Sequence, residues 1–175
     1  MAFEFKKLDI EGLILITPKH YYDPRGVFFE TYKKSDFYEN GITEEFVQDN
    51  CSYSMKDVLR GLHYQKDPKA QSKLVRCIKG TIWDVAVDFR QDSPTYKKWV
   101  GVKLTSENDK MLFIPKGFLH AFCALTEATI HYKCTELYDP SLDAGIRWDD
   151  PSIGIRWPIQ YPIVSDKDKN LPTAP

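Results

Sequence analysis

Hydrophobic and polar residues alternate along the chain in many short runs that are separated by turn residues. In the clearest run, Thr81–Phe89, alternation puts Trp83, Val85 and Val87 on one face. Asp84 falls on the opposite, polar face. A period of two is typical of a β-strand. Further strand-like runs are Leu13–Pro18, Val27–Tyr32, Phe46–Ser52, Lys73–Ile78, Trp99–Leu104, Met111–Ile114, Ala121–Leu125 and Thr129–Leu137.

These runs predict an all-β protein. Short, closely spaced strands with turn residues between them are typical of antiparallel sandwiches and barrels. One short helix is expected over Asp36–Asn40, capped by Ser35 and ended by Gly41. The long amphipathic helices of a doubly wound fold are absent from the pattern, as are linkers and internal repeats. With 175 residues, the chain is expected to form a single domain over 1–175.

The stretch Arg60–Cys77 holds the candidate chemistry, because it places a histidine, two arginines and a lysine in two strand-like runs. Alternation puts Lys73 on the same face as Val75 and Cys77. An ammonium group on an apolar face should point into an enclosed space, where it needs a partner or a function. We therefore expect either a buried salt bridge or a cavity lined by a base, His63, and a cation, Lys73.

Composition narrows the class of protein. The formal net charge is -1, so no overall field favours nucleic acid or an anionic membrane as a partner. No apolar run is long enough for a transmembrane helix, and the N-terminus lacks a signal core. We expect a soluble, cytoplasmic protein. The four cysteines form no C-x-x-C pair, which favours buried hydrophobes over metal or redox ligands.

A second motif, Pro115-x-Gly117-x-x-His120, resembles the second half of the pattern of cupins, which are small jelly-roll barrels. Metal-binding cupins also have two closely spaced histidines and a glutamate in an earlier motif. Here Tyr64 and Gln65 follow His63, so the histidine pair is missing. Zinc and iron sites want three or four nitrogen or oxygen ligands, and we therefore expect no metal.

Motifs that run in order along nearly the whole chain resemble one family. They are Asp23-x-Arg25-Gly26-x-Phe28-x-Glu30, Gln48-Asp49-Asn50, Arg60-Gly61-Leu62-His63-Tyr64-Gln65, Ala70-Gln71-x-Lys73-Leu74-Val75, Asp84-Val85-Ala86-Val87-Asp88, Ile114-Pro115-x-Gly117-Phe118-x-His120, Tyr132-Lys133, Tyr138-x-Pro140 and Asp166-x-Asp168. The chain resembles the dTDP-4-dehydrorhamnose 3,5-epimerases of deoxysugar biosynthesis, with Ala121 where the family more often has glycine. The resemblance implies a cupin-type jelly-roll fold with a few short helices.

The resemblance also implies a nucleotide-linked 4-keto sugar as substrate, dTDP-4-dehydro-6-deoxy-D-glucose. Its ketone acidifies the C3 and C5 hydrogens, so epimerisation needs a base, a group that stabilises the enolate and an acid, but no cofactor. His63 suits the base, and Lys73 suits the enolate oxygen. Tyr132 is the implied acid. Asp168, with Asp166 as the less favoured alternative, is the implied partner of the histidine.

Other residues are implied to bind substrate, and cations among them suit the diphosphate. An aromatic ring such as Tyr138 suits stacking on the base. The implied set is Arg25, Phe28, Glu30, Gln48, Asp49, Asn50, Arg60, His120, Tyr138, Asp143 and Lys167.

Three members of this set leave alternatives open. A regular strand puts Arg60 on the face opposite His63, so its place at the site requires a local irregularity; the alternative is a surface salt bridge. His120 either lines the sugar pocket or is a core histidine, and Asp84 could orient it. Asp143 is included by analogy with the family alone.

The family resemblance implies a homodimer in which an N-terminal segment reaches the partner's pocket. Arg25, Phe28 and Glu30 could then act across the interface. Two further functions stay open: a related nucleotide-sugar 3-epimerase, 5-epimerase or 3,4-ketoisomerase, and a cupin that binds a nucleotide sugar without catalysis.

Overall fold

A computed structural model describes residues 2–175. In chain order the elements are β1 (Phe3–Lys7), β2 (Ile14–Pro18), β3 (Tyr21–Asp23), β4 (Gly26–Phe28), α1 (Lys34–Glu39), β5 (Gln48–Ser54), β6 (Leu59–Gln65), β7 (Lys73–Lys79), β8 (Thr81–Asp88), β9 (Trp99–Thr105), β10 (Met111–Ile114), β11 (Phe118–Ala124), β12 (Ala128–Cys134), β13 (Asp143–Gly145) and α2 (Asp166–Lys169). The prediction of an all-β chain with a few short helices is confirmed.

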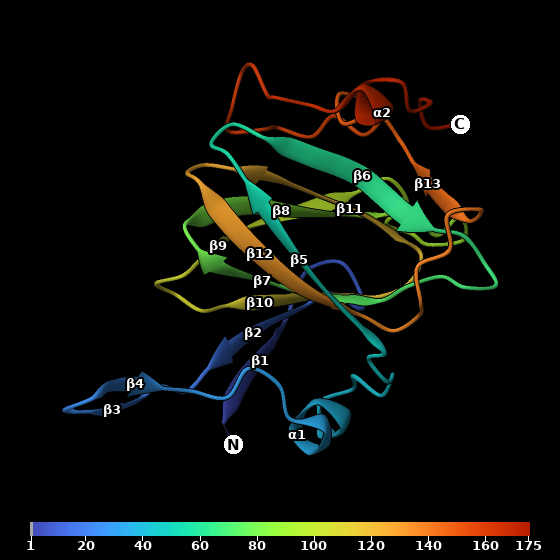
Figure 1. Cartoon of the computed structure of the whole chain (residues 1–175). Coiled ribbons are helices and arrows are strands. Elements are labelled where there is room, and N and C mark those ends of the chain that lie inside the picture. Colours follow the sequence, from blue (N-terminus) through green and yellow to red (C-terminus); the bar gives the residue numbers. More distant parts are fainter. Residues whose placement is uncertain (1) are drawn as a thin grey trace.

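Two antiparallel sheets form the predicted jelly-roll sandwich. Six strands pair in the order β1-β2-β10-β7-β12-β5, and five pair in the order β13-β6-β11-β8-β9. Strands β3 and β4 form a separate hairpin. Figure 1 shows this hairpin projecting from the body, while α2 and the C-terminal tail lie over β6.

Apolar side chains from both sheets fill part of the space between them. The residues of this core that are 0% exposed include Val75, Cys77, Ala86, Leu104 and Ile130. Fully burying one such larger side chain stabilises the fold by roughly 1.5–3 kcal/mol. Because Val75 and Cys77 face this interior, the prediction that their face of β7 points into an enclosed space is confirmed.

Strand β8 is buried on both faces, which alternation alone does not predict. Val85 and Val87 pack against Ile153 and Trp157 of the C-terminal tail, so the tail covers the outer face. Asp84 lies on the inner face and is fully buried. The polar face expected for this strand is therefore not open to water, because the opposite sheet covers it.

The N-terminal third differs from the prediction in two places. The expected helix forms as α1, but it follows Lys33, whose side chain makes no capping hydrogen bond, so Ser35 is not the cap. Gly41, with φ of +89°, follows its end as expected. The strand expected over Val27–Tyr32 stops at Phe28, where the pairing of β4 with β3 ends.

Strand β6 contains the irregularity predicted near Arg60. It pairs with β11 so that His63 lies opposite His120 and Arg60 lies opposite Phe122, with a register shift between the two pairs. The three-residue step in β6 thus faces a two-residue step in β11, which is a β-bulge. Gly61 lies in the bulge with φ of +119°. The bulge lets Arg60 and His63 line the same cavity.

Replacing Gly61 by alanine should lower the free energy of unfolding by roughly 2–4 kcal/mol. The added Cβ would lie 2.5 Å from the Ala121 Cβ and 2.6 Å from the His120 carbonyl oxygen. The Gly41→Ala variant is the matched control, because Gly41 also has a positive φ, +89°, but an added Cβ there meets nothing within 4 Å.

Urea unfolding of both variants separates steric overlap from backbone strain, and the strain alone costs about 1–2 kcal/mol. If the free energy of unfolding fell equally in the two variants, the close approach of β6 and β11 at Gly61 would not contribute to the destabilisation.

Candidate active site

A continuous site opens between the two sheets. One hollow, of about 540 Å³, is lined by residues of β5, β6, β7, β11 and β12 and by the segment around α2. A second hollow, of about 310 Å³, adjoins it. His63, Lys73, Tyr132 and Lys167 line both hollows, which we call the inner pocket and the outer pocket.

His63 is held by a carboxylate from the C-terminal part of the chain. Its Nε2 lies 2.7 Å from Oδ1 of Asp168, which is almost completely buried. The backbone N–H of Gly61 donates to Oδ2 of the same carboxylate at 3.1 Å. Ser165 caps α2 by accepting from the Asp168 N–H, which places this carboxylate over β6. The alternative partner, Asp166, is exposed and pairs with Lys169 instead.

The surroundings of Asp168 favour its charged form. Burial opposes ionisation, but the hydrogen bonds from His63 and the Gly61 N–H outweigh it, so the pKa of Asp168 is lowered. A carboxylate only accepts, so the His63 nitrogen that faces it, Nε2, carries the proton. Nδ1 is then the basic nitrogen of the neutral ring, and no hydrogen bond among residues 2–175 occupies it.

Lys73 and Tyr132 lie on adjacent strands of the opposite sheet. Val75 pairs with Tyr132 and Lys73 pairs with Cys134, and the Lys73 Nζ lies 5.9 Å from the centre of the Tyr132 ring. Burial lowers the pKa of Lys73 and raises that of Tyr132, because each charged form loses contact with water. Within the described chain Lys73 forms no ion pair, so the buried salt bridge is not its role.

A second histidine–carboxylate pair lies behind the first. The His120 Nε2 lies 2.8 Å from Oδ1 of Asp84, and both residues are buried. His120 lines the inner pocket. Oδ2 of Asp84 is buried and has no hydrogen-bond partner among residues 2–175. The suggestion that Asp84 orients His120 is thus confirmed.

Arg60 lines the inner pocket and is held there by neutral groups. Its Nε donates to Oγ of Ser54 at 3.0 Å, and its Nη2 donates to the carbonyl oxygen of Tyr53 at 3.1 Å. Among residues 2–175 Arg60 forms no salt bridge, so the alternative of a surface salt bridge is not found in the described chain.

Polar side chains line the outer pocket. Gln48 donates to Asn50 Oδ1 at 3.0 Å. The Tyr138 hydroxyl donates to Oδ2 of Asp143 at 3.2 Å, and Lys167 forms an ion pair with the same oxygen. These five residues come from β5, β13, the α2 segment and the loop after β12, and the fold brings them together at the outer pocket.

Asp49 is not brought to the site, although Gln48 and Asn50 are. Alternation along β5 turns its side chain to the outer face of the sheet, where Lys133 Nζ lies 2.9 Å from Oδ1. The prediction that three consecutive side chains share one role does not fit a strand, because neighbours in a strand point to opposite faces.

The three N-terminal residues also lie away from the pockets. Arg25 is exposed on the β3–β4 hairpin, with Nη2 2.6 Å from Oδ2 of Asp23. Phe28 is exposed on the same hairpin. Glu30, just after it, has a buried Oε2 without a partner in the described chain. Neither pocket is lined by Arg25, Phe28 or Glu30.

Sequence reasoning missed Ser52, which lines the inner pocket. Its Oγ is buried and makes no hydrogen bond within residues 2–175. The signal was present, because Ser52 lies two positions after Asn50 and so shares its face of β5. The apolar lining from Val58, Ile163 and Val164 could not be read from a pattern, since these residues lie outside the strands.

Among residues 2–175, no three His, Cys, Asp or Glu side chains are grouped as metal ligands would be. Nor does any helix there have both the length and the apolar character needed to cross a bilayer.

Comparisons with known proteins agree on one family. The family model described as dTDP-4-dehydrorhamnose 3,5-epimerase matches residues 7–174. The chain is 53% identical over 172 residues to the dTDP-4-dehydrorhamnose 3,5-epimerase of Methanothermobacter thermautotrophicus, covering 96% of this chain and 92% of that one.

Solved structures show the same similarity. A crystal structure of dTDP-4-dehydrorhamnose 3,5-epimerase from Bacillus anthracis with TDP and PPi bound gives a TM-score of 0.96 at 44% identity, covering 99% of this chain and 100% of that one. The dTDP-6-deoxy-D-glucose-3,5-epimerase of Legionella pneumophila in complex with dTDP-4-keto-L-rhamnose gives 0.94 at 44% identity, covering 98% and 92%.

Proposed function

This chain belongs to the dTDP-4-dehydrorhamnose 3,5-epimerase family and is an isomerase, and on that premise we propose that it inverts C3 and C5 of dTDP-4-dehydro-6-deoxy-D-glucose to give dTDP-4-dehydro-L-rhamnose. The observation that carries the proposal is the convergence of His63, Lys73 and Tyr132 on one enclosed pocket. The nucleotide and keto-sugar bound to the Bacillus and Legionella relatives support a dTDP-sugar as ligand.

His63 is the proposed base. Its Nδ1 takes the proton next to the ketone, and the electron pair of the broken C–H bond moves to the ketone oxygen as an enolate. The ring then carries a positive charge, which the buried Asp168 carboxylate at 2.7 Å stabilises. Because Asp168 is ionised before the reaction starts, this stabilisation needs no rearrangement.

Lys73 is the proposed partner of the enolate oxygen. Its ammonium has given up part of its hydration without gaining a carboxylate within the described chain. A negative charge that develops on the substrate supplies the missing partner, so the interaction is stronger with the enolate than with the ketone. No redox cofactor and no metal is needed, because the ketone itself acidifies the hydrogens.

Tyr132 is the proposed acid. Burial raises the pKa of its hydroxyl, so the phenol is protonated at neutral pH and can deliver a proton. It lies on β12, in the sheet opposite the one that carries His63. Removal of a proton from one side of the ring and return from the other inverts the carbon.

The outer pocket is the proposed nucleotide site. Gln48 and Asn50 present amide groups suited to the edge of a pyrimidine, and Tyr138 presents a ring suited to stacking. Lys167 lines both pockets and Arg60 lines the inner pocket, and both cations are suited to the diphosphate.

Incubation of the protein with dTDP-4-keto-6-deoxyglucose in D₂O, followed by NMR, tests this function. We expect deuterium at both C3 and C5, and none in the His63→Ala variant. Deuterium at one carbon would indicate a 3- or 5-epimerase. Its absence from both in the wild type would favour a ketoisomerase, if the ketone moves to C3, or a binding protein without catalysis.

The same experiment tests the acid. The Tyr132→Phe variant should retain exchange but lose net inversion, because deprotonation does not need the phenol. Exposed Tyr161 provides the control variant Tyr161→Phe, which should behave as wild type. Full epimerisation by Tyr132→Phe would move the acid role to another residue, with Tyr138 the next candidate.

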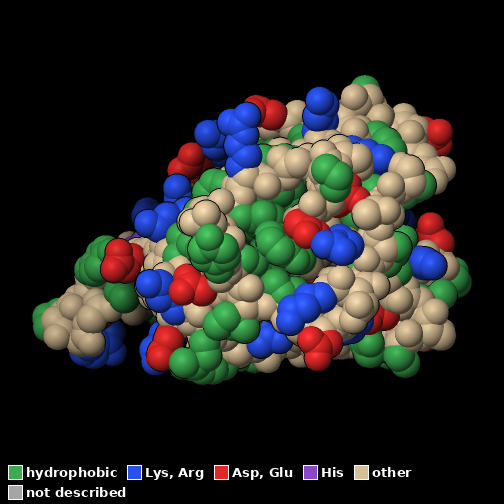
Figure 2. Space-filling view, turned by 90° about the horizontal axis from the view of Figure 1, so that it is seen from above, with side chains coloured by type: hydrophobic (Ala, Val, Ile, Leu, Met, Phe, Trp, Pro, Cys, Tyr) green, Lys and Arg blue, Asp and Glu red, His purple; other side chains and the backbone are tan. Residues whose placement is uncertain are grey.

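We also propose a homodimer in which the β3–β4 hairpin reaches the pocket of a second copy. The hairpin projects from the body (Figure 1), and Figure 2 shows hydrophobic side chains at this projection. Tyr22 and Phe28 of the hairpin are exposed. Exposed apolar surface of this kind is typical of an interaction site. A hairpin shared in this way would bring Arg25, Phe28 and Glu30 to the partner's pocket. The cytoplasmic location expected from the sequence stays a prediction.

Mixed dimers test this arrangement. One chain carries His63→Ala, and the other carries Arg25→Ala together with Phe28→Ala; each variant alone should be almost inactive. If hairpins act across the interface, co-refolding the two should restore one intact site in each mixed dimer, and so about half the activity of a wild-type dimer. No restoration, with mixed dimers present by mass spectrometry, would show that each hairpin serves its own chain.

A further inference from the structure

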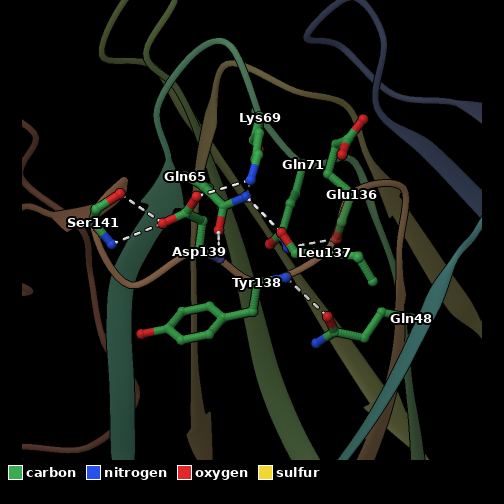
Figure 3. Close-up of polar contacts among 9 residues, drawn as sticks. All are labelled: Gln48, Gln65, Lys69, Gln71, Glu136, Leu137, Tyr138, Asp139 and Ser141. Carbon is green, nitrogen blue, oxygen red and sulfur yellow. Dashed lines mark hydrogen bonds and ion pairs between the residues drawn. The ribbon is translucent and has the colours of Figure 1, made fainter.

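The segment Glu136–Ser141 carries Tyr138 to the outer pocket with little apolar packing. Its two large side chains are largely exposed, Leu137 by 60% and Tyr138 by 55%. Burial of these side chains therefore contributes little to holding the segment in place. Its position depends on polar contacts, most of which Figure 3 shows.

Gln65 makes the buried part of these contacts. It is the last residue of β6, two positions after His63, and is 5% exposed. Its Nε2 donates to the carbonyl oxygens of Lys69 at 2.6 Å and Leu137 at 3.0 Å, and its Oε1 accepts from the Asp139 N–H at 2.8 Å. Figure 3 shows the amide between the two loops that it joins.

The other contacts of the segment are closer to water. The Lys69 Nζ lies 2.9 Å from Oδ2 of Asp139, and Gln71 donates to the Glu136 carbonyl oxygen at 2.8 Å. An exposed ion pair contributes little on average. By contrast, removal of the Gln65 amide, which is itself buried, would leave two carbonyl groups and one N–H without their partner in a part-buried place.

We propose that Gln65 is a positioning residue for substrate binding: it fixes the loop that carries Tyr138 to the strand that carries His63. The proposal rests on the proposed function and deepens it. Only a neutral amide fits the role, since the position demands two N–H donors and one acceptor on a single planar group. The link sets the place of the stacking ring relative to the base, so it should govern nucleotide affinity rather than the chemical step.

The first test compares two variants with similar loss of polarity. Gln65→Met removes the buried amide and keeps most of the volume, whereas Lys69→Met removes only the exposed ion pair to Asp139. Calorimetric titration with dTDP gives the Kd, and deuterium uptake at saturating substrate gives kcat. We expect at least a tenfold higher Kd for Gln65→Met with kcat within about threefold of wild type, because loss of base stacking on an aromatic ring weakens binding by roughly 5- to 150-fold. Lys69→Met should stay within about twofold in both.

The second test uses a variant with a titratable group. In Gln65→Glu, a protonated carboxyl can still donate to one carbonyl oxygen, whereas a carboxylate faces two carbonyl oxygens and repels both. Burial shifts such a carboxyl toward its neutral form. The ratio of the Kd values for dTDP, variant over wild type, should therefore rise as pH increases from 5.5 to 8. A loss of structure unrelated to the amide would give a ratio that does not change with pH.

The outcomes separate this inference from the function on which it rests. Wild-type protein that neither binds dTDP nor exchanges deuterium would overturn both. A normal wild type with an unchanged Kd in Gln65→Met, or with kcat reduced as much as kcat/KM, would overturn the role of Gln65 alone. If Gln65→Met does not fold, the Gln65→Glu ratio decides: a ratio that rises with pH supports the role, and a constant ratio overturns it.

Discussion

The contact between Asp168 and His63 joins the C-terminal tail to strand β6, and the site depends on it. A buried carboxylate must be paired, because an unpaired charge away from water costs several kcal/mol. The C-terminal tail meets this condition by crossing the outer face of the five-stranded sheet and delivering Asp168 to β6. Backbone hydrogen bonds of Ile163 with Asp57 and Leu59 fix the tail just before α2. The same contact orients the imidazole of His63. One interaction therefore both pairs the buried carboxylate and positions the proposed base.

The charges around the site are unevenly matched. Both histidines of the inner pocket have a carboxylate partner, Asp168 for His63 and Asp84 for His120. Lys73 has none within the described chain, and its pKa is lowered by burial. In the proposed mechanism, the negative charge that develops on the reacting sugar supplies the missing partner of Lys73. The proposed enolate would therefore be bound more strongly than the ketone.

Local periodicity predicted much of the site. Alternation alone predicted that Lys73 faces inward. At Arg60, alternation conflicted with the role that the family resemblance implies, and this conflict predicted the bulge that β6 contains. Periodicity within one strand did not predict contacts between parts of the chain that are distant in sequence. The burial of both faces of β8 results from the C-terminal tail, which no pattern within the strand reveals.

Some features of the fold and the site could not be predicted from the sequence. Asp166 and Asp168 lie in similar sequence surroundings, and only the contacts of the Asp168 carboxylate with His63 and Gly61 show which one faces β6. Strands β1 and β13 were missed because they are short edge strands, whose pairing depends on neighbours far along the chain. The amide of Gln65 shares the face of His63, but its three partners lie in two loops that the pattern does not position.

The most direct test of this account is the protonation state of His63 in the free protein. Nitrogen-15 NMR of histidine-labelled protein distinguishes the two neutral tautomers, and the His63→Ala variant assigns the signal. We predict that Nε2, which faces Asp168, carries the proton of the neutral ring and that Nδ1 is unprotonated. A ring protonated at Nδ1 instead would contradict the account, because the nitrogen that opens on the pocket could not then act as the base.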